Sequence, residues 1–282
     1  MTENSSPSVI DSHIHTWKLN DGRKIWTREK IGALYRDYSL DEFKAAYTGL
    51  NLAGVIIVQA AVDTKETKEL LQQYADDPLV KGVVGWVDLS ADDIEQKIEE
   101  LSQIPKFMGV RAHPPKHFDV DWLMSAATVR GMKVLTERNI PIDYLVNTTQ
   151  LDEFRAVFEK VPGVKAVLDH AGRPFVMTGD TEKWERDIRN LARDTDCYCK
   201  LSGLSERAGV EWNKDTLKPW IEILLDAFGP ERLIYGSNWP IMTLMSTPKI
   251  WVNTLNEIFD DFGLPESSRA QIFNTTVLQV YQ

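Results

Sequence analysis

The sequence of 282 residues contains only two cysteines, Cys197 and Cys199, which are separated by a single residue. Residues i and i+2 of a strand point to the same face, and a disulfide between them would be strained. We therefore expect no disulfide framework, as is usual in a reducing compartment. The amino-terminal segment is polar and has neither the basic nor the apolar region of a secretory signal, so the sequence predicts a cytoplasmic protein.

The chain also lacks a long apolar run and a cluster of basic residues. No apolar stretch reaches the roughly 20 residues that a membrane-spanning helix requires. Lys and Arg number 32 against 42 Asp and Glu, which gives a net charge of −10 and a sequence pI of about 5.1. Nucleic acid and anionic membranes are therefore not expected as partners. A small anionic molecule could still bind where Arg and Lys side chains gather in a cleft.

No linker-like change of composition divides the chain. Hydrophobic residues make up 43% and charged residues 26%, which is ordinary for a globular protein. A chain of this length can bury a large core without disulfides or structural metals. We expect one domain over residues 1–282.

Short apolar runs alternate with longer amphipathic stretches along the whole chain. Eight runs have the composition of strands covered on both faces: Val9–His13, Gly54–Ala60, Val80–Leu89, Phe107–His113, Ile140–Val146, Val164–His170, Cys197–Gly203 and Leu233–Asn238. Helices are predicted at 40–50, 64–75, 92–102, 122–138, 149–160, 181–194, 214–228 and 248–260, with another from about 266. This alternation predicts a parallel α/β fold, and eight strands favour a (β/α)₈ TIM barrel. An open doubly wound sheet is the alternative, but no glycine-rich dinucleotide motif follows the first strand.

Polar residues gather at the predicted carboxyl ends of these strands, where the active site of such a barrel lies. Four of the five histidines lie there: His13, His15, His113 and His170. The fifth, His117, follows just beyond one strand, and we expect it on the surface. This distribution differs from that of scattered surface histidines and indicates a site.

His13 and His15 are two positions apart on a predicted strand, so their imidazoles should point the same way. Such a pair can hold one divalent cation or polarise one carbonyl group. It can also make purely structural hydrogen bonds. The presence of His170 at the end of another strand favours the functional interpretation.

Three motifs resemble those of the amidohydrolase superfamily. They are Asp11-Ser12-His13-Ile14-His15, Asp169-His170-Ala171-Gly172-Arg173-Pro174 and Tyr235-Gly236-Ser237-Asn238-Trp239-Pro240. The resemblance covers nearly the whole chain and is strongest to the amidohydrolase-2 branch. That branch includes lactonases that open sugar-acid lactones, such as fuconolactone and rhamnonolactone, and pyrone dicarboxylate lactonases.

The resemblance implies catalytic roles for His13, His15 and His170, which would also be the ligands of one divalent metal such as Zn²⁺. In two-metal relatives a lysine on the fourth strand bridges the ions, whereas this sequence has Arg111 and His113 there. We therefore expect one metal at most, and no organic cofactor.

Position 238 departs from the family pattern, because the general base of the family is an aspartate after the eighth strand and this sequence has Asn238. A carboxamide cannot take a proton from water at neutral pH, and loss of a general base costs about 10²–10⁴ in rate. Three explanations stay open: another base such as Asp143, Asp11 or a metal-bound hydroxide; an aspartate altered to trap substrate; or a binding protein that has lost catalysis.

Several further residues are predicted to bind substrate. Arg111, Arg173 and Lys200 are expected to grip a carboxylate or a hydroxylated chain, because Arg suits bidentate contacts with carboxylates. Asp143 and Ser202 are expected to share hydrogen bonds with hydroxyl groups, and His113 to line the pocket. Arg111 could instead pair with Asp143 or Asp169 inside the barrel, Arg173 could close the loop after the sixth strand, and Lys200 could pair with an acidic neighbour. Trp239 is either a wall for substrate stacking or ordinary packing.

The segment 16–38 carries Trp17, Trp26, Tyr35 and Tyr38 and is expected to cover the mouth of the barrel, either as a sugar-binding wall or as plain packing. The leading functional hypothesis is a lactonase that acts on a small sugar-acid lactone. The alternatives are a metal-dependent decarboxylase of the same superfamily and a non-catalytic ligand-binding barrel. The sequence leaves a homo-oligomer open.

Overall fold

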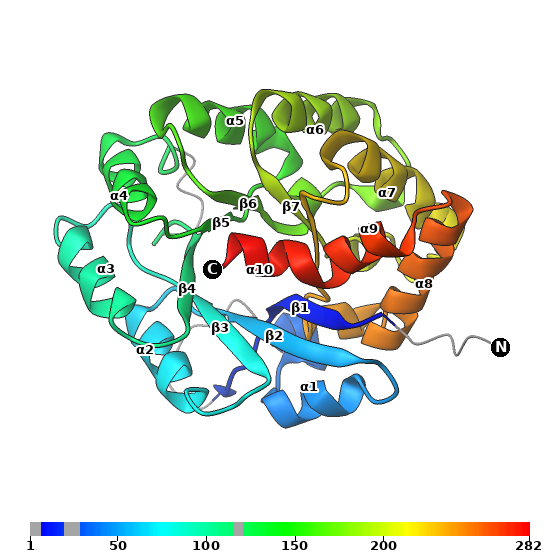
Figure 1. Cartoon of the computed structure of the whole chain (residues 1–282), viewed down its shortest axis with the longest axis horizontal. Coiled ribbons are helices and arrows are strands. Elements are labelled where there is room, and N and C mark those ends of the chain that lie inside the picture. The colour runs from blue at the N-terminus through cyan, green and yellow to red at the C-terminus, as the bar shows by residue number, and fades with distance from the viewer. Residues whose placement is uncertain (1–6, 20–28, 116–120) are drawn as a thin grey trace.

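A computed structural model describes residues 7–19, 29–115 and 121–282. Its single sheet contains eight strands in sequence order, and each strand pairs in parallel with the next. The strands are β1 (Val9–Ile14), β2 (Leu52–Val58), β3 (Val80–Gly85), β4 (Phe107–Ala112), β5 (Ile142–Tyr144), β6 (Ala166–Leu168), β7 (Tyr198–Leu201) and β8 (Leu233–Tyr235). A parallel bridge between Ile14 and Trp239 brings the end of β8 back to β1. The predicted (β/α)₈ barrel is therefore confirmed (Figure 1).

Helices surround the strands (Figure 1). The α-helices are α1 (Leu40–Ala46), α2 (Thr64–Gln73), α3 (Ile94–Ser102), α4 (Ala126–Glu137), α5 (Leu151–Lys160), α6 (Glu182–Asp194), α7 (Lys214–Phe228), α8 (Pro248–Asp261), α9 (Glu266–Ala270) and α10 (Thr276–Val280). Short helical turns lie between them: η2 (Glu29–Leu34), η3 (Thr148–Gln150), η4 (Asp169–Gly172), η5 (Val176–Thr178), η6 (Ser205–Arg207), η7 (Ile241–Leu244) and η8 (Gln271–Thr275).

Amphipathic sequences form most of the outer layer, since helices such as α2, α5 and α6 bury an apolar face and expose a polar one. In α6, for example, Trp184, Ile188 and Leu191 are buried, and of the charged residues only Asp187 is buried with them. Ser39 caps the start of helix α1. Its side chain accepts a hydrogen bond from the backbone amide of Glu42, and the Glu42 side chain accepts one from the backbone amide of Ser39.

The carboxyl-terminal helix α10 closes the amino end of the barrel, where it lies across the view of Figure 1. The Thr276 hydroxyl lies 3.3 Å from the carbonyl oxygen of Pro230, just before β8. Val277, Val280 and Tyr281 then pack against residues of the barrel interior such as Ile10, Ile56, Val84, Val167 and Ile234. The opposite, carboxyl end is therefore the one at which polar side chains can form a site.

Several strands end earlier than the sequence predicted. Strand β6 ends at Leu168 rather than His170, and β8 ends at Tyr235 rather than Asn238. His170, Ala171 and Arg173 have φ between 52° and 56°, and Asn238 has φ of 62°. These left-handed conformations turn the chain out of the sheet and place the polar residues in loops. The apolar pattern predicts where a strand runs, but it does not reveal these turns.

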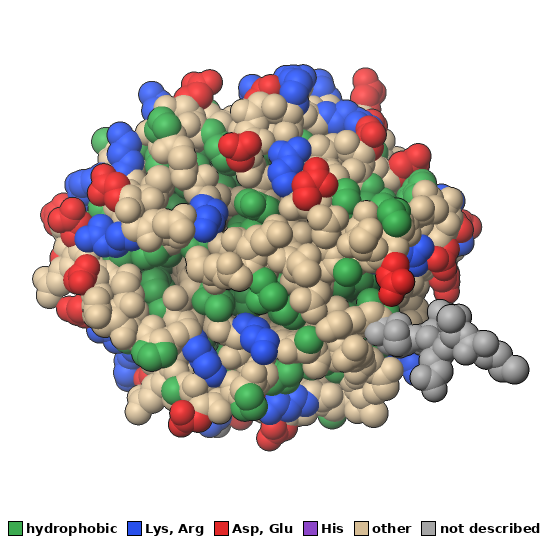
Figure 2. Space-filling view, viewed as in Figure 1, with side chains coloured by type: hydrophobic (Ala, Val, Ile, Leu, Met, Phe, Trp, Pro, Cys, Tyr) green, Lys and Arg blue, Asp and Glu red, His purple; other side chains and the backbone are tan. Residues whose placement is uncertain are grey.

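The face around α10 carries interspersed acidic and basic side chains, with no histidine visible on it (Figure 2). None of the helices in the described ranges is long and apolar enough to cross a membrane. Cys197 and Cys199 are both buried free thiols, as predicted.

Candidate active site

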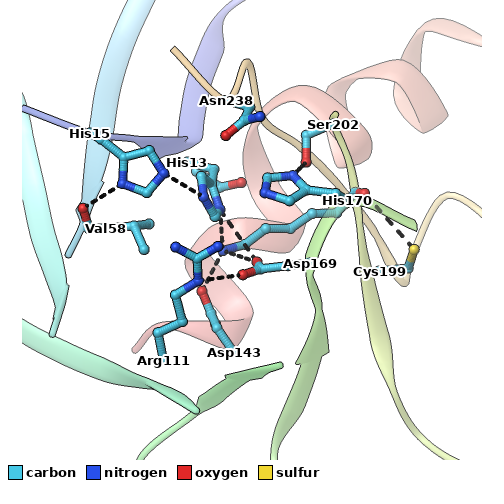
Figure 3. Close-up of polar contacts among 12 residues, drawn as sticks. His13, His15, Val58, Arg111, Asp143, Asp169, His170, Cys199, Ser202 and Asn238 are labelled. Atoms are coloured by element: carbon cyan, nitrogen blue, oxygen red, sulfur yellow. Dashed lines mark hydrogen bonds and ion pairs between the residues drawn. The ribbon is translucent and has the colours of Figure 1, made fainter. Parts of the chain in front are cut away.

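Three histidines meet at the carboxyl end of the barrel (Figure 3). The Nε2 atoms of His13 and His15 lie 3.2 Å apart, so the two side chains point the same way. The ring centroid of His170 lies 4.4 Å from that of His13. The backbone holds this arrangement, because the Asn238 amide donates to the carbonyl oxygen of His13 at 2.9 Å.

All three imidazoles are neutral at neutral pH. Burial lowers the pKa of His13 and His170 well below the ordinary value, and it lowers the pKa of His15 to about 3 with Arg111 contributing. His15 Nδ1 lies 2.9 Å from the carbonyl oxygen of Val58, so it carries the proton and Nε2 is an acceptor. His13 then donates from Nε2 to His15.

His170 is held by β7 and by an unusual turn. Its Nδ1 lies 2.8 Å from the hydroxyl of Ser202. Gly203, with φ of +70°, packs against the ring so closely that a Cβ at this position would lie 2.7 Å from His170 Cβ. Left-handed conformations at non-glycine residues cost roughly 1–3 kcal/mol each and concentrate at functional sites. The turn Asp169–Gly172 therefore represents strain that serves to present His170.

Beneath the histidines, a buried polar column runs toward the floor of the barrel. Lys200 Nζ forms ion pairs with Asp143 and with Asp169, the latter at 3.1 Å, and lies 3.2 Å from His13 Nδ1. Arg111 Nε donates to Asp169 at 3.0 Å. Burial alone would raise the pKa of Asp169, but Lys200, His13 and Arg111 together lower it well below the usual range.

Three of the predicted substrate-binding residues lie within the protein interior. Lys200 and Asp143 are completely buried, and Asp143 also accepts from the hydroxyl of Tyr281. Ser202 is completely buried and contacts His170. Lys200 and Asp143 pair with each other below His13, and Ser202 pairs with His170, so each of these polar groups has a partner within the protein.

Trp239 also packs internally. It is 2% exposed, and its ring makes edge contacts with Tyr38 at 5.3 Å and Phe43 at 5.6 Å. Trp17 packs on Tyr38 in turn. Of the two interpretations of Trp239, the geometry therefore favours packing over a stacking wall. Trp26 lies outside the described residues.

Arg173 and His113, two further residues predicted to bind substrate, follow β6 and β4 and are only partly buried. Arg173 is half-buried, and its pKa is lowered to about 10 by burial and by the neighbouring Arg207 and Arg111. No acidic side chain within the described ranges pairs with Arg173. His113 is half-buried after β4, where its Nδ1 contacts the carbonyl oxygen of Pro114. His117 lies outside the described residues.

A metal would find suitable donors in this cluster. Ligand atoms of His13, Asp169 and His170 all lie within 4.8 Å of one another. Asp169 Oδ1 accepts no hydrogen bond from the described residues, although the ammonium of Lys200 lies 3.1 Å away. Neutral imidazoles with a carboxylate form a donor set that zinc accepts. The cluster contains Asp169 where His15 was expected.

The sequence analysis missed one carboxylate, Glu206 in the turn after β7. Its Oε1 accepts a hydrogen bond of 2.8 Å from the side-chain amide of Asn238, and its Oε2 accepts one of 2.7 Å from the hydroxyl of Ser205. The side chain is half-buried, and burial raises its pKa above that of an ordinary glutamate. The sequence gives one indication of this residue, which is that an acidic residue follows shortly after Gly203 at the end of the seventh strand.

The comparisons with known proteins agree with this geometry. A family model described as Amidohydrolase matches residues 10–282, and the chain belongs to this family. An L-fucono-1,5-lactonase of Burkholderia ambifaria is 28% identical, with 97% of this chain and 95% of that protein covered. An L-fucono-1,5-lactonase of Burkholderia multivorans is 30% identical, with 96% and 95% covered.

The solved structures show the same relationship. An amidohydrolase from Burkholderia multivorans with bound zinc has a TM-score of 0.89 at 30% identity, and the match covers 97% of this chain and 98% of that one. A 5-carboxyvanillate decarboxylase from Sphingomonas paucimobilis matches at a TM-score of 0.63 with 12% identity over 98% of this chain and 99% of its own, which shows the fold alone. The protein is thus a hydrolase of the amidohydrolase type.

Proposed function

We propose that this protein hydrolyses a small lactone and that its substrate is the lactone of a sugar acid. The observation that carries the proposal is the cluster of neutral imidazoles of His13, His15 and His170 at the carboxyl end of the barrel. The similarity to two L-fucono-1,5-lactonases over nearly the whole chain supports the same class of substrate.

Hydrolysis requires a polarised carbonyl group, and the buried imidazoles can provide it. When the Ser202 hydroxyl donates to Nδ1 of His170, Nε2 of that ring carries a proton that it can donate to the carbonyl oxygen of the lactone. A donor held rigidly in a site of low dielectric stabilises the negative charge that develops on this oxygen. Ser202 and the turn after β6 therefore keep His170 oriented.

Arg111 and Arg173 suit the polar part of the substrate. Arg111 engages Asp169 through Nε, which leaves its terminal nitrogens for a ligand, and Arg173 lies nearby. Guanidinium groups can hold hydroxyl oxygens and the carboxylate of the product. A divalent cation held by His13, Asp169 and His170 would be the alternative to proton donation by His170, because the ring nitrogen that binds a metal carries no proton; the cation would then supply Lewis-acid polarisation of the lactone carbonyl.

Acid release from a panel of aldono-1,4- and aldono-1,5-lactones tests the proposal. The wild-type protein should release acid in proportion to enzyme concentration and above the spontaneous rate. His170→Asn should lower the rate by about 10²-fold or more, since one oxyanion donor is lost. Lys249→Ala on the exposed surface of α8 is the matched control and should keep full activity.

A wild-type protein that is inert on every lactone of the panel would contradict the proposal. Carbon dioxide release from a hydroxybenzoate in the same assay would instead support the decarboxylase hypothesis. Thermal stabilisation by a lactone without turnover would support the ligand-binding hypothesis.

A further inference from the structure

Within residues 7–19, 29–115 and 121–282, the carboxylates seen to form hydrogen bonds or ion pairs with the residues of the site are Asp11, Asp143, Asp169 and Glu206. A general base must be able to contact a water molecule in the pocket. Asp11, Asp143 and Asp169 are completely buried, whereas Glu206 keeps part of its surface exposed. Of these four carboxylates, Glu206 is therefore the one whose side chain is exposed enough to contact water.

The hydrogen-bond and ion-pair partners of the buried carboxylates also argue against a role for them as the general base. Asp11 accepts from the backbone amides of His13 and Ser237 and from the hydroxyl of Tyr47, which fastens β1 to β8. Asp143 is held between Lys200 and Tyr281. These contacts hold both groups in the interior, so neither of the two aspartates considered as a base from the sequence is available to water.

Glu206 lies next to the position at which the family pattern has its base. The backbone amide of Asn238 is fixed on the His13 carbonyl group, and this places the Asn238 side chain beside the histidines, on the side of Ser202 (Figure 3). The Asn238 amide then donates to Glu206 Oε1 at 2.8 Å. Each carboxylate oxygen of Glu206 receives one hydrogen bond from the described residues, and each can accept another.

We infer that Glu206 is the general base of this enzyme and that Asn238 is a positioning residue that orients the Glu206 carboxylate. This inference rests on the proposed lactone hydrolysis. The amide at position 238 and the carboxylate at position 206 together replace the single aspartate of the family pattern. The carboxylate has moved from the loop after β8 to the loop after β7.

The chemical step balances without a further reactant. Glu206 takes a proton from a water molecule as the water oxygen forms a bond to the lactone carbonyl carbon. The bond between that carbon and the ring oxygen then breaks, and its electron pair goes to the ring oxygen. Glu206 returns the proton to this oxygen, which gives the hydroxy acid and restores the carboxylate.

The surroundings of Glu206 determine its pH dependence. Arg207, in the same turn η6, is the charged group that faces it, and η7 (Ile241–Leu244) packs against η6 without any ionisable side chain. Burial raises the pKa of Glu206 more than its hydrogen bonds and Arg207 lower it. Because a base acts in its ionised form, activity should rise with pH through a value above that of an ordinary glutamate.

The test compares Glu206→Gln, Asn238→Asp and the double exchange on one turned-over lactone, with pH profiles of kcat and KM. E206Q should lower kcat by about 10²–10⁴-fold with little change in KM, and it should abolish the acid limb of the profile. N238D should shift that limb to higher pH, because two adjacent carboxylates resist joint ionisation. The double variant E206Q/N238D restores one carboxylate opposite one amide and should recover activity relative to E206Q.

Two controls separate a catalytic from a structural effect. Glu211→Gln removes an exposed carboxylate a few residues along and should leave the profile unchanged. Circular dichroism and Tm should show that E206Q is folded, and recovery in the double variant gives independent evidence of a folded site.

The measurements distinguish a failure of the Glu206 assignment from a failure of the proposed function. If the wild-type protein is active and E206Q keeps both its kcat and its acid limb, Glu206 is not the base, while lactone hydrolysis stands. An N238D variant faster than wild type at neutral pH, with no recovery in the double variant, would also overturn the assignment. If wild type and every variant are inert on all lactones, the proposed function fails and the role of Glu206 falls with it.

Discussion

Replacing Lys200 by methionine would remove the cation from the centre of the polar column. The ammonium group is completely buried between Asp143 and Asp169. Arg111 would still compensate Asp169, so the loss falls mainly on Asp143, which would keep only the hydroxyl of Tyr281 among the contacts described above.

Removing one partner of a buried ion pair costs roughly 3–5 kcal/mol, because the other charge remains desolvated. The lower end applies here, since Asp169 keeps Arg111. With an unfolding entropy of about 2.1 cal/mol/K per residue, a loss of about 3 kcal/mol in a chain of 282 residues lowers Tm by about 5 °C.

Urea unfolding followed by tryptophan fluorescence would measure the effect. Lys200→Met should lower the free energy of unfolding by about 3 kcal/mol, and adding Asp143→Asn should recover a large part of it by removing the uncompensated charge. Lys65→Met, at an exposed pair with Glu69, is the control and should not differ from wild type. A K200M protein as stable as wild type would refute the view that Lys200 is the counter-ion on which the column depends.

Three further predictions concern Tyr47, Arg173 and the two cysteines. Tyr47→Phe removes the hydroxyl that donates to buried Asp11 at 2.6 Å and should cost about 1–3 kcal/mol in urea unfolding; an unchanged midpoint would argue against this contact. Arg173→Met should raise KM about 10-fold or more, and Tm should not fall, because the lost cation had no acidic partner in the described ranges; an unchanged KM would exclude substrate contact. Burial raises the pKa of Cys197 and Cys199, so a thiol reagent should label both only after unfolding; rapid labelling of the native protein would contradict their burial.

Much of the architecture could be predicted from the sequence, because apolar runs covered on both faces and amphipathic stretches recur eight times along the chain. The gathering of histidines at strand ends also predicted where the site lies, and His13, His15 and His170 do meet there. The spacing of two residues between His13 and His15 was sufficient to predict a common direction, since the period of a strand is two.

The depth of each side chain could not be predicted. Lys200 and Asp143 point into the barrel from β7 and β5, but sequence position does not reveal that they lie below the histidines and pair with each other. Glu206 was missed for a related reason. It lies in a loop, and only the three-dimensional course of the turns after β7 and β8 brings it to Asn238.

The central claim is that a water molecule attacks the carbonyl carbon of a lactone in this site. Hydrolysis of an aldonolactone by the wild-type protein in ¹⁸O-labelled water, with mass analysis of the product, tests it most directly. The account predicts enzyme-dependent formation of the hydroxy acid with a single heavy oxygen in the carboxylate and none in the released hydroxyl group. Label in the hydroxyl group, or no product beyond the spontaneous reaction, would contradict it.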